Sequence, residues 1–387
     1  MNKSTTVFLG GPDMGADAAA VEAQKNRCSE QHFIYRRGVE LGWLGVRDAS
    51  AEKPVQDMES IWRSARPLHL RAIVSDRLAA VEPDMEQTYA LVEGVLDGES
   101  VMSMMNELGY FDRIENEFQF AGGFSDESDR QGIEQLEFET AEGEDQDGVS
   151  IWMKASWLSF EDDDASLRFR FSYGREGHED VASNFHKEQL TAMLAEAIFP
   201  ESSAITSNAA LGQTLRQVTG IKKTAFVERI YYFNAPNGGA LFHHDVERGH
   251  DGVVYAQLFG STAWLALSKS DLLDNFLAFL DTENIETTLS SYFESSEISD
   301  ILQNRGERQY WSERFDDRED GTVEILLNHI PAFFARLVAQ GHAYILHAGD
   351  VILLPQASLE ACCWHTVFCL DDFPGEALSF AVRDTPA

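Results

Sequence analysis

The sequence predicts an α+β protein, because two kinds of hydrophobic periodicity succeed one another along the chain. Between residues 18 and 111 apolar residues recur three and four positions apart, as in Met85 to Leu96, which is the spacing of an amphipathic helix. Between Ile133 and Gly174 apolar and polar residues alternate, as expected of strands. After residue 224 short β-branched and aromatic runs are separated by glycine turns, which is typical of paired strands.

The composition is that of a soluble globular protein. The chain has 387 residues, of which 44% are hydrophobic and 25% charged, enough for one large or two ordinary domains. It contains no run of 18 apolar residues and no signal-peptide pattern, so we expect a cytoplasmic protein without a membrane partner. The cysteines lack zinc-ligand spacing and fit a reducing compartment; they are Cys28, Cys362, Cys363 and Cys369.

The formal net charge is −35. Such a surface repels nucleic-acid phosphate and anionic lipid, so we expect no nucleic-acid partner and favour a neutral or basic one. The alternative interpretation is that the acidic residues only keep the protein soluble.

The first half of the chain contains no catalytic motif. Its alternating runs Val149 to Phe160 and Ser166 to Tyr173 flank an acidic stretch, Glu161 to Ala165, which predicts a meander with an acidic turn. Phe185 to Ile198 has helical spacing, and the polar segment Pro200 to Gly220 is typical of a connector. The three aromatic residues of the meander that we expect in the core are Trp152, Phe169 and Phe171. We expect a domain boundary in the connector, giving regions 1–207 and 208–387.

One short motif carries the chemistry of the second half. His243 and Asp245 are two residues apart, so on an extended strand their side chains leave the same face. With His365 as a third ligand, they would form the two-histidine, one-carboxylate set of non-haem Fe(II) oxygenases, which leaves the opposite side of the metal open. Four other histidines are expected to be ordinary polar residues, namely His244, His250, His342 and His347.

The segments that follow this motif in the chain resemble those of a known protein family. Ala240 to Asp245 is followed by two strand-like runs around the turn Gly260-Ser261. Further on come Gly349 to Pro355, Trp364-His365 and Ala377 to Arg383. This order resembles the JmjC and cupin-like branch of the Fe(II)- and 2-oxoglutarate-dependent oxygenases, from Thr224 to Arg383. The resemblance implies a C-terminal double-stranded β-helix, a jelly-roll or cupin-like barrel, after a mixed helical and β N-terminal region.

The resemblance also implies the cofactors and the reaction. Fe(II) held by His243, Asp245 and His365 would use 2-oxoglutarate and dioxygen to oxidise a C–H bond. Family members that halogenate lack the carboxylate found here at Asp245, so hydroxylation is favoured, with desaturation and ring closure left open.

The far carboxylate of 2-oxoglutarate requires a cation. Many JmjC-type relatives supply a lysine after the glycine turn, but this chain has no lysine beyond Lys269. Arg383 on the last strand is our first candidate, since its planar fork suits a carboxylate, and Arg229 is the second. Further hydrogen bonds are expected from Thr262, Tyr231, Asn234 and Ser379.

The remaining protein suggests a large substrate or a homodimer. A helical insertion, residues 268–341, separates the two halves of the expected barrel and either shapes access to the metal or braces the barrel. We expect hydroxylation of an unactivated C–H bond in a peptidyl, carrier-linked or natural-product substrate. The alternatives are a cupin-type metalloenzyme without 2-oxoglutarate and a catalytically silent acidic binding module.

Overall fold

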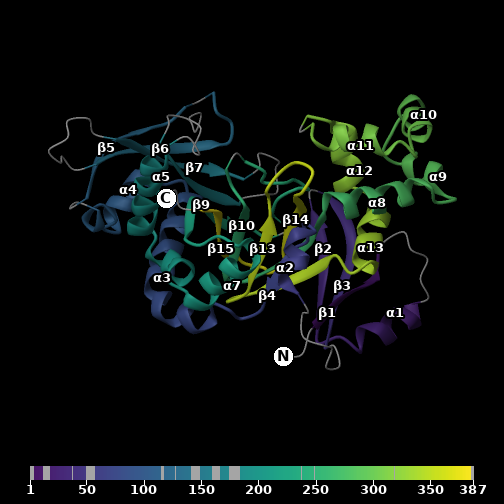
Figure 1. Cartoon of the computed structure of the whole chain (residues 1–387), viewed down its shortest axis with the longest axis horizontal. Coiled ribbons are helices and arrows are strands. Elements are labelled where there is room, and N and C mark those ends of the chain that lie inside the picture. The colour runs from purple at the N-terminus through teal and green to yellow at the C-terminus, as the bar shows by residue number, and fades with distance from the viewer. Residues whose placement is uncertain are drawn as a thin grey trace.

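The protein combines helices with large antiparallel sheets, which confirms the predicted α+β class. A computed structural model describes residues 4–11, 18–36, 38–48, 57–114, 117–126, 128–140, 149–158, 166–173, 184–236, 238–247, 249–317 and 319–384. Strands of the second half lie at the centre, with helices α3 to α5 on one side and the helices of the insertion on the other (Figure 1).

The central feature is a nine-stranded antiparallel sheet with the order β4-β13-β10-β15-β9-β8-β7-β6-β5. Its strands are β4 (Leu68–Leu70), β13 (Val351–Pro355), β10 (Gly252–Phe259), β15 (Gly375–Asp384), β9 (Thr224–Asn234), β8 (Leu167–Ser172), β7 (Ser150–Trp157), β6 (Gly132–Thr140) and β5 (Phe118–Phe124). Leu167 of β8 lies opposite Phe233 of β9. The sheet therefore runs on across the boundary that we expected between residues 207 and 208.

A three-stranded sheet shares a core with the large one. It consists of β12 (Ala343–His347), β11 (Ser261–Ser268) and β14 (Cys363–Cys369), in that order. Trp264 of β11 and Val367 of β14 belong to one hydrophobic cluster with Tyr255 of β10 and Ile352 of β13. Because side chains alternate along a strand, His365 of β14 shares the inward side with Val367.

A third sheet, formed by the N-terminal residues, supports the insertion. Its order is β1-β3-β2, with β1 (Ser4–Gly10), β3 (Val39–Asp48) and β2 (Glu30–Arg36), and α1 (Ala18–Lys25) lies between β1 and β2 in the chain. Helix α13 (Pro331–Ala339) packs on β1 and β3. Ile34 and Leu44 share a core with Phe276 and Phe333 of the insertion.

The helices of the first half share a core with the large sheet. They are α2 (Met58–Arg63), α3 (Ser75–Leu96), α4 (Val101–Glu107), η1 (Phe111–Arg113), α5 (Phe185–Ile198), η4 (Pro200–Ser202), α6 (Ser203–Thr206) and α7 (Ala209–Thr219). Leu91 of α3 and Phe380 of β15 belong to the same core. The predicted helix Met85 to Leu96 is the second half of α3, and Gly98 beyond it has a φ of 94°, which glycine adopts without strain.

The meander predicted from alternation is present as β5 to β8. Phe169 and Phe171 are fully buried and Trp152 is nearly so, as expected of core residues. The expected acidic turn, residues 161–165, lies outside the described residues.

The insertion is helical, as predicted. Between β11 and β12 it contains α8 (Lys269–Leu280), α9 (Ile285–Leu289), α10 (Ser295–Gln303), α11 (Arg308–Phe315), α12 (Gly321–Asn328) and α13. Among the described residues no single helix has the length and apolar character needed to cross a membrane, and only the bent pair α12 and α13, taken together, meets that test.

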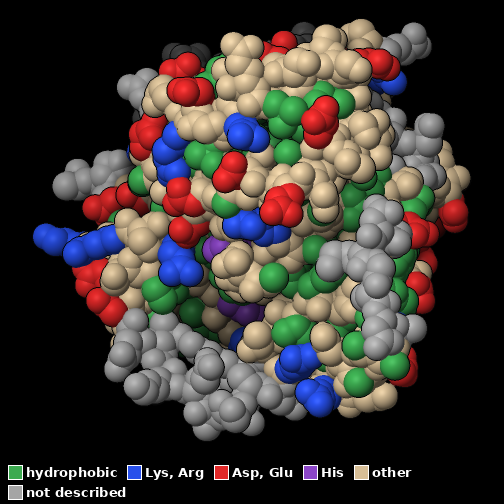
Figure 2. Space-filling view, turned by 90° about the vertical axis from the view of Figure 1, so that its right-hand side faces the viewer, with side chains coloured by type: hydrophobic (Ala, Val, Ile, Leu, Met, Phe, Trp, Pro, Cys, Tyr) green, Lys and Arg blue, Asp and Glu red, His purple; other side chains and the backbone are tan. Residues whose placement is uncertain are grey.

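Acidic side chains are spread over the face that carries the insertion, with fewer basic ones between them (Figure 2).

Candidate metal centre

Two histidines from distant parts of the chain form one antiparallel backbone pair. His243 N–H donates to the carbonyl oxygen of His365 at 3.0 Å, and His365 N–H donates to that of His243 at 2.9 Å. Residues that exchange both hydrogen bonds lie directly opposite one another, with their side chains on the same side. The two imidazole rings are accordingly 4.2 Å apart between centroids.

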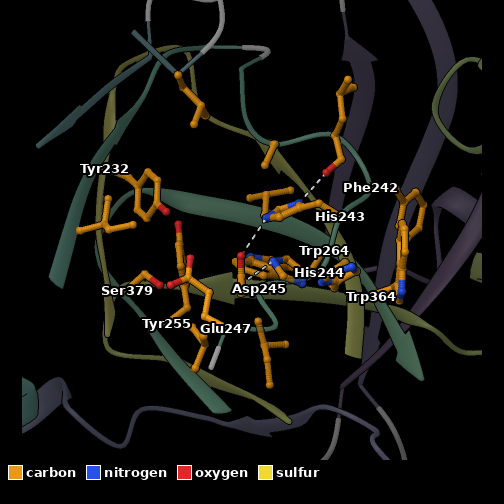
Figure 3. A pocket seen from close by; sticks show the side chains of 18 of the residues that line it. Tyr232, Phe242, His243, His244, Asp245, Glu247, Tyr255, Trp264, Trp364 and Ser379 are labelled. Carbon is orange, nitrogen blue, oxygen red and sulfur yellow. Dashed lines mark hydrogen bonds and ion pairs between the residues drawn. The ribbon is translucent and has the colours of Figure 1, made fainter. Parts of the chain in front are cut away.

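Asp245 completes the predicted trio (Figure 3). Its Oδ1 is 3.4 Å from Nε2 of His243 and its Oδ2 is 3.4 Å from Nε2 of His365. Atoms about 2.1 Å from a shared metal lie about 3.0–3.4 Å apart when the angle at the metal is about 90–110°. The structure thus brings the three predicted ligands together at a separation that suits one metal ion.

Hydrogen bonds orient both imidazoles. His243 Nδ1 lies 2.7 Å from the carbonyl oxygen of Leu241, and His365 Nδ1 lies 3.4 Å from that of Cys363. A proton on each Nδ1 would satisfy these carbonyls, which assigns the tautomer that leaves Nε2 as the ligand atom. Trp264 stacks on His365 with ring centroids 5.4 Å apart, which restricts the ring further.

The protonation states suit metal ligands. Burial, helped by His243, lowers the pKa of His365 to about 3, so this imidazole is neutral. Burial raises the pKa of Asp245, but His365 and His243 outweigh it and hold that pKa well below its usual range. A neutral imidazole and an ionised carboxylate are the forms that bind a metal.

The trio faces a cavity of about 460 Å³. Tyr232, Tyr255, Ser379 and Glu247 lie on one side of Asp245, and Phe242 and Trp364 lie beyond the histidines on the other (Figure 3). Asn234 also lines this cavity, so two of the four predicted hydrogen-bonding residues, Asn234 and Ser379, are in contact with it.

Three other predicted co-substrate residues do not line the cavity. Arg383 Nη1 donates to both carboxylate oxygens of Glu188, at 2.7 and 2.9 Å. Tyr231 is fully buried and its hydroxyl donates to Ala195 O at 3.3 Å. Thr262 is fully buried and donates to Gln257 Oε1 at 2.8 Å. The second candidate cation, Arg229, is paired with Glu196 at 2.7 Å.

Strand alternation could have identified Tyr232. On β9 Tyr232 and Asn234 share one face, whereas Tyr231 faces the core of the first half. The tyrosine next to the one that we predicted is therefore the one that reaches the cavity.

Two arginines of β8 line the cavity and were not identified from the sequence. Leu167, Phe169 and Phe171 are buried, so alternation places Arg168 and Arg170 on the opposite face. Arg170 forms an ion pair with Glu228. In the described part of the chain Arg168 has no carboxylate within ion-pair distance, and its Nε donates to Ser156 Oγ at 2.9 Å.

The pKa values of the two arginines reflect this difference. Burial lowers the pKa of the Arg168 guanidinium. Burial acts on Arg170 in the same direction, but the Glu228 carboxylate raises its pKa overall. Arg168 is thus the arginine of this wall that has no carboxylate at ion-pair distance in the part of the chain that the structure describes.

A second group of ligand-type residues lines the same cavity, namely Glu228, Glu247 and His250. Nδ1 of His250 lies 3.7 Å from Oε2 of Glu228. Burial and the Glu228 carboxylate raise the pKa of Glu247 to about 7. The Arg170 guanidinium already holds the Glu228 carboxylate, so this group has a cation of its own.

The insertion contributes a wall of the cavity and shares a hydrophobic core with the three-stranded sheet. Phe315 of α11 and Val323 and Leu327 of α12 are apolar lining residues. Lys269 Nζ lies 2.7–2.8 Å from the carboxylate of Asp316, which ties the start of α8 to the end of α11. The insertion thus lies against both the cavity and the three-stranded sheet, and its role in access to the metal stays a prediction.

The other residues beside the trio are packing residues. Cys362 and Cys363 are fully buried, and burial raises the pKa of the Cys362 thiol to about 12. His244, which we expected to be an ordinary polar residue, packs edge-on against Trp364 with ring centroids 5.2 Å apart.

The sequence matches no protein-family model and no curated protein. Among solved structures the chain is similar to YcfD, a ribosomal oxygenase from Escherichia coli, with 13% identity and a TM-score of 0.23 over 73% of this chain and 44% of that one. It is also similar to an oxidoreductase of the 2OG-Fe(II) oxygenase family from Burkholderia pseudomallei, with 8% identity and a TM-score of 0.24 over 71% and 89%. The chain thus spans less than half of YcfD. TM-scores this low carry no weight for the activity, and the site's own geometry is the evidence for it.

Proposed function

We propose that this protein is an Fe(II)- and 2-oxoglutarate-dependent oxygenase built on a double-stranded β-helix. The observation that carries the proposal is the convergence of His243, Asp245 and His365 at one side of a cavity, with each histidine Nε2 3.4 Å from an oxygen of Asp245. The path of the chain supports the barrel assignment, because β10, β13 and β15 belong to the large sheet and β11, β12 and β14 to the three-stranded one, so the chain crosses repeatedly between two facing sheets.

The donor set fits Fe(II). Two imidazoles and one carboxylate occupy one side of a metal and leave the positions toward the cavity for co-substrate and dioxygen. Bound iron with 2-oxoglutarate would supply the dioxygen activation that removes a hydrogen atom from a substrate C–H bond. The chain's own part is to fix the three ligands and to surround the open side with a shaped cavity.

Arg168 replaces Arg383 as our candidate for the far carboxylate of 2-oxoglutarate. It lines the cavity and has no carboxylate partner among the described residues, whereas Arg383, Arg229 and Arg170 each hold a glutamate. A bidentate arginine contact suits a carboxylate. Tyr232, Asn234 and Ser379 line the same cavity and offer hydrogen bonds to the co-substrate.

The substrate would reach the iron past the insertion. Phe315, Val323 and Leu327 offer apolar surface there, next to the carboxylates of Asp317, Asp320 and Glu324. This mixed lining suits a substrate with a hydrocarbon part at the C–H bond to be hydroxylated and neutral or basic groups elsewhere. The size of the N-terminal region and the net charge of −35 favour a peptidyl, carrier-linked or natural-product substrate that is neutral or basic.

Anaerobic titration with Fe(II), followed by 2-oxoglutarate, tests the proposal. We expect one iron per chain and slow conversion of 2-oxoglutarate to succinate in air. Arg168→Met should weaken 2-oxoglutarate binding about 10- to 150-fold, the equivalent of about 1.5–3 kcal/mol for a charge-assisted contact, and leave iron binding intact.

Arg383→Met is the matched control and should leave 2-oxoglutarate binding unchanged. Iron binding without 2-oxoglutarate turnover would instead support a cupin-type metalloenzyme. A wild-type protein without metal affinity would support a silent binding module.

A further inference from the structure

One asparagine of the insertion holds the backbone next to a metal ligand. Asn328, at the end of α12, is 8% exposed. Its Oδ1 accepts a hydrogen bond from the backbone N–H of Phe242 at 2.8 Å, and its Nδ2 donates to the carbonyl oxygen of Glu324 at 3.0 Å. The second bond fixes the amide on its own helix, so Oδ1 is directed at the residue that precedes His243.

The segment that carries His243 is thereby held on both edges. On the inner edge it pairs with β14 through the two backbone bonds between His243 and His365, and Val367 N–H donates to Ala240 O at 3.0 Å. Successive N–H groups of an extended segment point in opposite directions, so that of Phe242 points away from β14. Asn328 supplies its acceptor there.

The same helix also forms part of the cavity wall. Val323, Leu327 and Asn328 of α12 all line the cavity that the metal trio faces. A shift of α12 caused by a bound molecule would therefore be transmitted to the neighbourhood of His243. The contact that transmits it is the hydrogen bond from Asn328 Oδ1 to the peptide group between Leu241 and Phe242. The carbonyl oxygen of that peptide group is the one that orients the His243 ring, at 2.7 Å from Nδ1.

We infer that Asn328 is a positioning residue for the metal centre, which sets the place of His243 and couples it to the substrate-facing helix α12. The inference rests on the proposed metal site. Outer partners that orient a metal ligand commonly change metal affinity about 10- to 100-fold when they are removed. We expect a change in that range when the acceptor at residue 328 is lost.

Cobalt(II) is a suitable probe, because its absorption spectrum reports ligand geometry without any turnover. Asn328→Leu removes both hydrogen bonds at similar size, and Asn328→Asp keeps only the acceptor. We expect Asn328→Leu to weaken Co(II) binding at least about 10-fold and to change the spectrum, and Asn328→Asp to restore most of both.

Asn275→Leu is the matched control. Asn275 makes the same kind of bond to its own helix, from Nδ2 to Asp271 O at 2.9 Å, in α8 of the same insertion. Its Nδ2 also lies 3.4 Å from Nε2 of His342, and among the described residues no hydrogen bond joins it to the segment that carries His243. It should leave Co(II) affinity and spectrum as in the wild type.

The Co(II) affinities and spectra of these variants either support the role of Asn328 or refute it. An unchanged affinity and spectrum in Asn328→Leu would overturn the inference, and so would equal losses in Asn328→Leu and Asn275→Leu. If Asn328→Leu does not fold, Asn328→Ala, which adds no bulk, is measured against Asn328→Asp in its place, and equal binding by these two would be fatal to the inference. A wild-type protein that binds no Co(II) would instead refute the proposed function.

Discussion

Two groups of ligand-type residues face the same cavity, yet they differ in what balances their charge. His243, Asp245 and His365 form one group, and Glu228, Glu247 and His250 form the other; in each the ligand atoms lie within 4.8 Å of one another. Among the described residues the ion pairs of Asp245 are with imidazoles, whereas Arg170 forms an ion pair with Glu228. By the distances between their ligand atoms alone, the two groups would be equally good candidates for a metal site. They differ because Arg170 is paired with a carboxylate of the second group.

We infer from this difference that the first group suits a metal ion better, because among the described residues no lysine or arginine balances the charge of its carboxylate. In the second group one carboxylate has an arginine, and the pKa of the other is raised to about 7 by burial and its neighbour. The first group offers an ionised carboxylate and a neutral, buried His365. A divalent cation would complete the first group and would compete with Arg170 in the second.

The largest expected effect is on the metal affinity of the first group. His365→Ala and Asp245→Ala each remove one of three ligands, so we expect metal affinity to fall by more than about 100-fold, beyond the usual range for outer residues. Isothermal titration with Fe(II) under nitrogen measures it.

Glu247→Ala is the control from the second group and should stay within about threefold of the wild type, since it removes no ligand of the first. If Glu247→Ala lost metal as His365→Ala does, the two groups would have to be read as one extended site.

Removing the arginine should make the second group resemble the first. Arg170→Met leaves Glu228, Glu247 and His250 without their cation, so we expect a second, weaker metal equivalent in the same titration, with an affinity that rises with pH as the carboxyls ionise. Arg168→Met, which removes an arginine without a carboxylate partner, should leave the count at one. A count of one in Arg170→Met as well would mean that something other than Arg170 excludes metal from this group.

The two groups also show how far the sequence could lead. The spacing of His243 and Asp245 and the alternation of side chains along β8 and β9 are local features. The sequence alone therefore predicts which side chains share a face with the ligands and which share a face with Arg168 and Arg170. Arg383, our first candidate for the far carboxylate, does not line the cavity. It is paired with Glu188, which lies 195 residues earlier in the chain and is brought to it by the docking of α5 on the sheet. Contacts of this kind depend on tertiary packing, and no local sequence pattern near Arg383 predicts them.

The course of the large sheet was hidden for a similar reason. The segments that form β5 to β8 alternate as strands should, but nothing local says that β8 pairs with β9. The segment between α5 and β9, which we expected to be a polar connector, instead forms η4, α6 and α7 and contributes to the core. A domain boundary placed there therefore cuts through a continuous sheet.

The smallest expected effect concerns buried carboxyls that have neither a metal nor a cation. Glu201 is fully buried and Glu376 is 3% exposed, and among the described residues neither has a lysine or arginine within ion-pair distance. Glu201 Oε1 accepts a hydrogen bond from Thr88 Oγ1 at 2.8 Å. Burial raises the pKa of Glu201 to about 7 and that of Glu376 well above its usual value, in the second case with Glu201 as a further cause.

The sign of the pH dependence follows from these raised values. A carboxyl whose pKa is higher in the folded state contributes stability that is complete below its unfolded value, near 4.5, and is lost as the pH rises through about 7. Glu201→Gln keeps the shape without the charge, so between pH 5 and pH 8 its free energy of unfolding should fall less than that of the wild type, by about 1–2 kcal/mol.

Glu188→Gln is the contrast: this buried carboxylate holds Arg383, so its loss should destabilise the protein at both pH values. Chemical denaturation at the two pH values measures all three proteins. Parallel losses in Glu201→Gln and the wild type would show that Glu201 stays ionised in the fold, and that burial without a cation does not by itself keep a carboxyl protonated here.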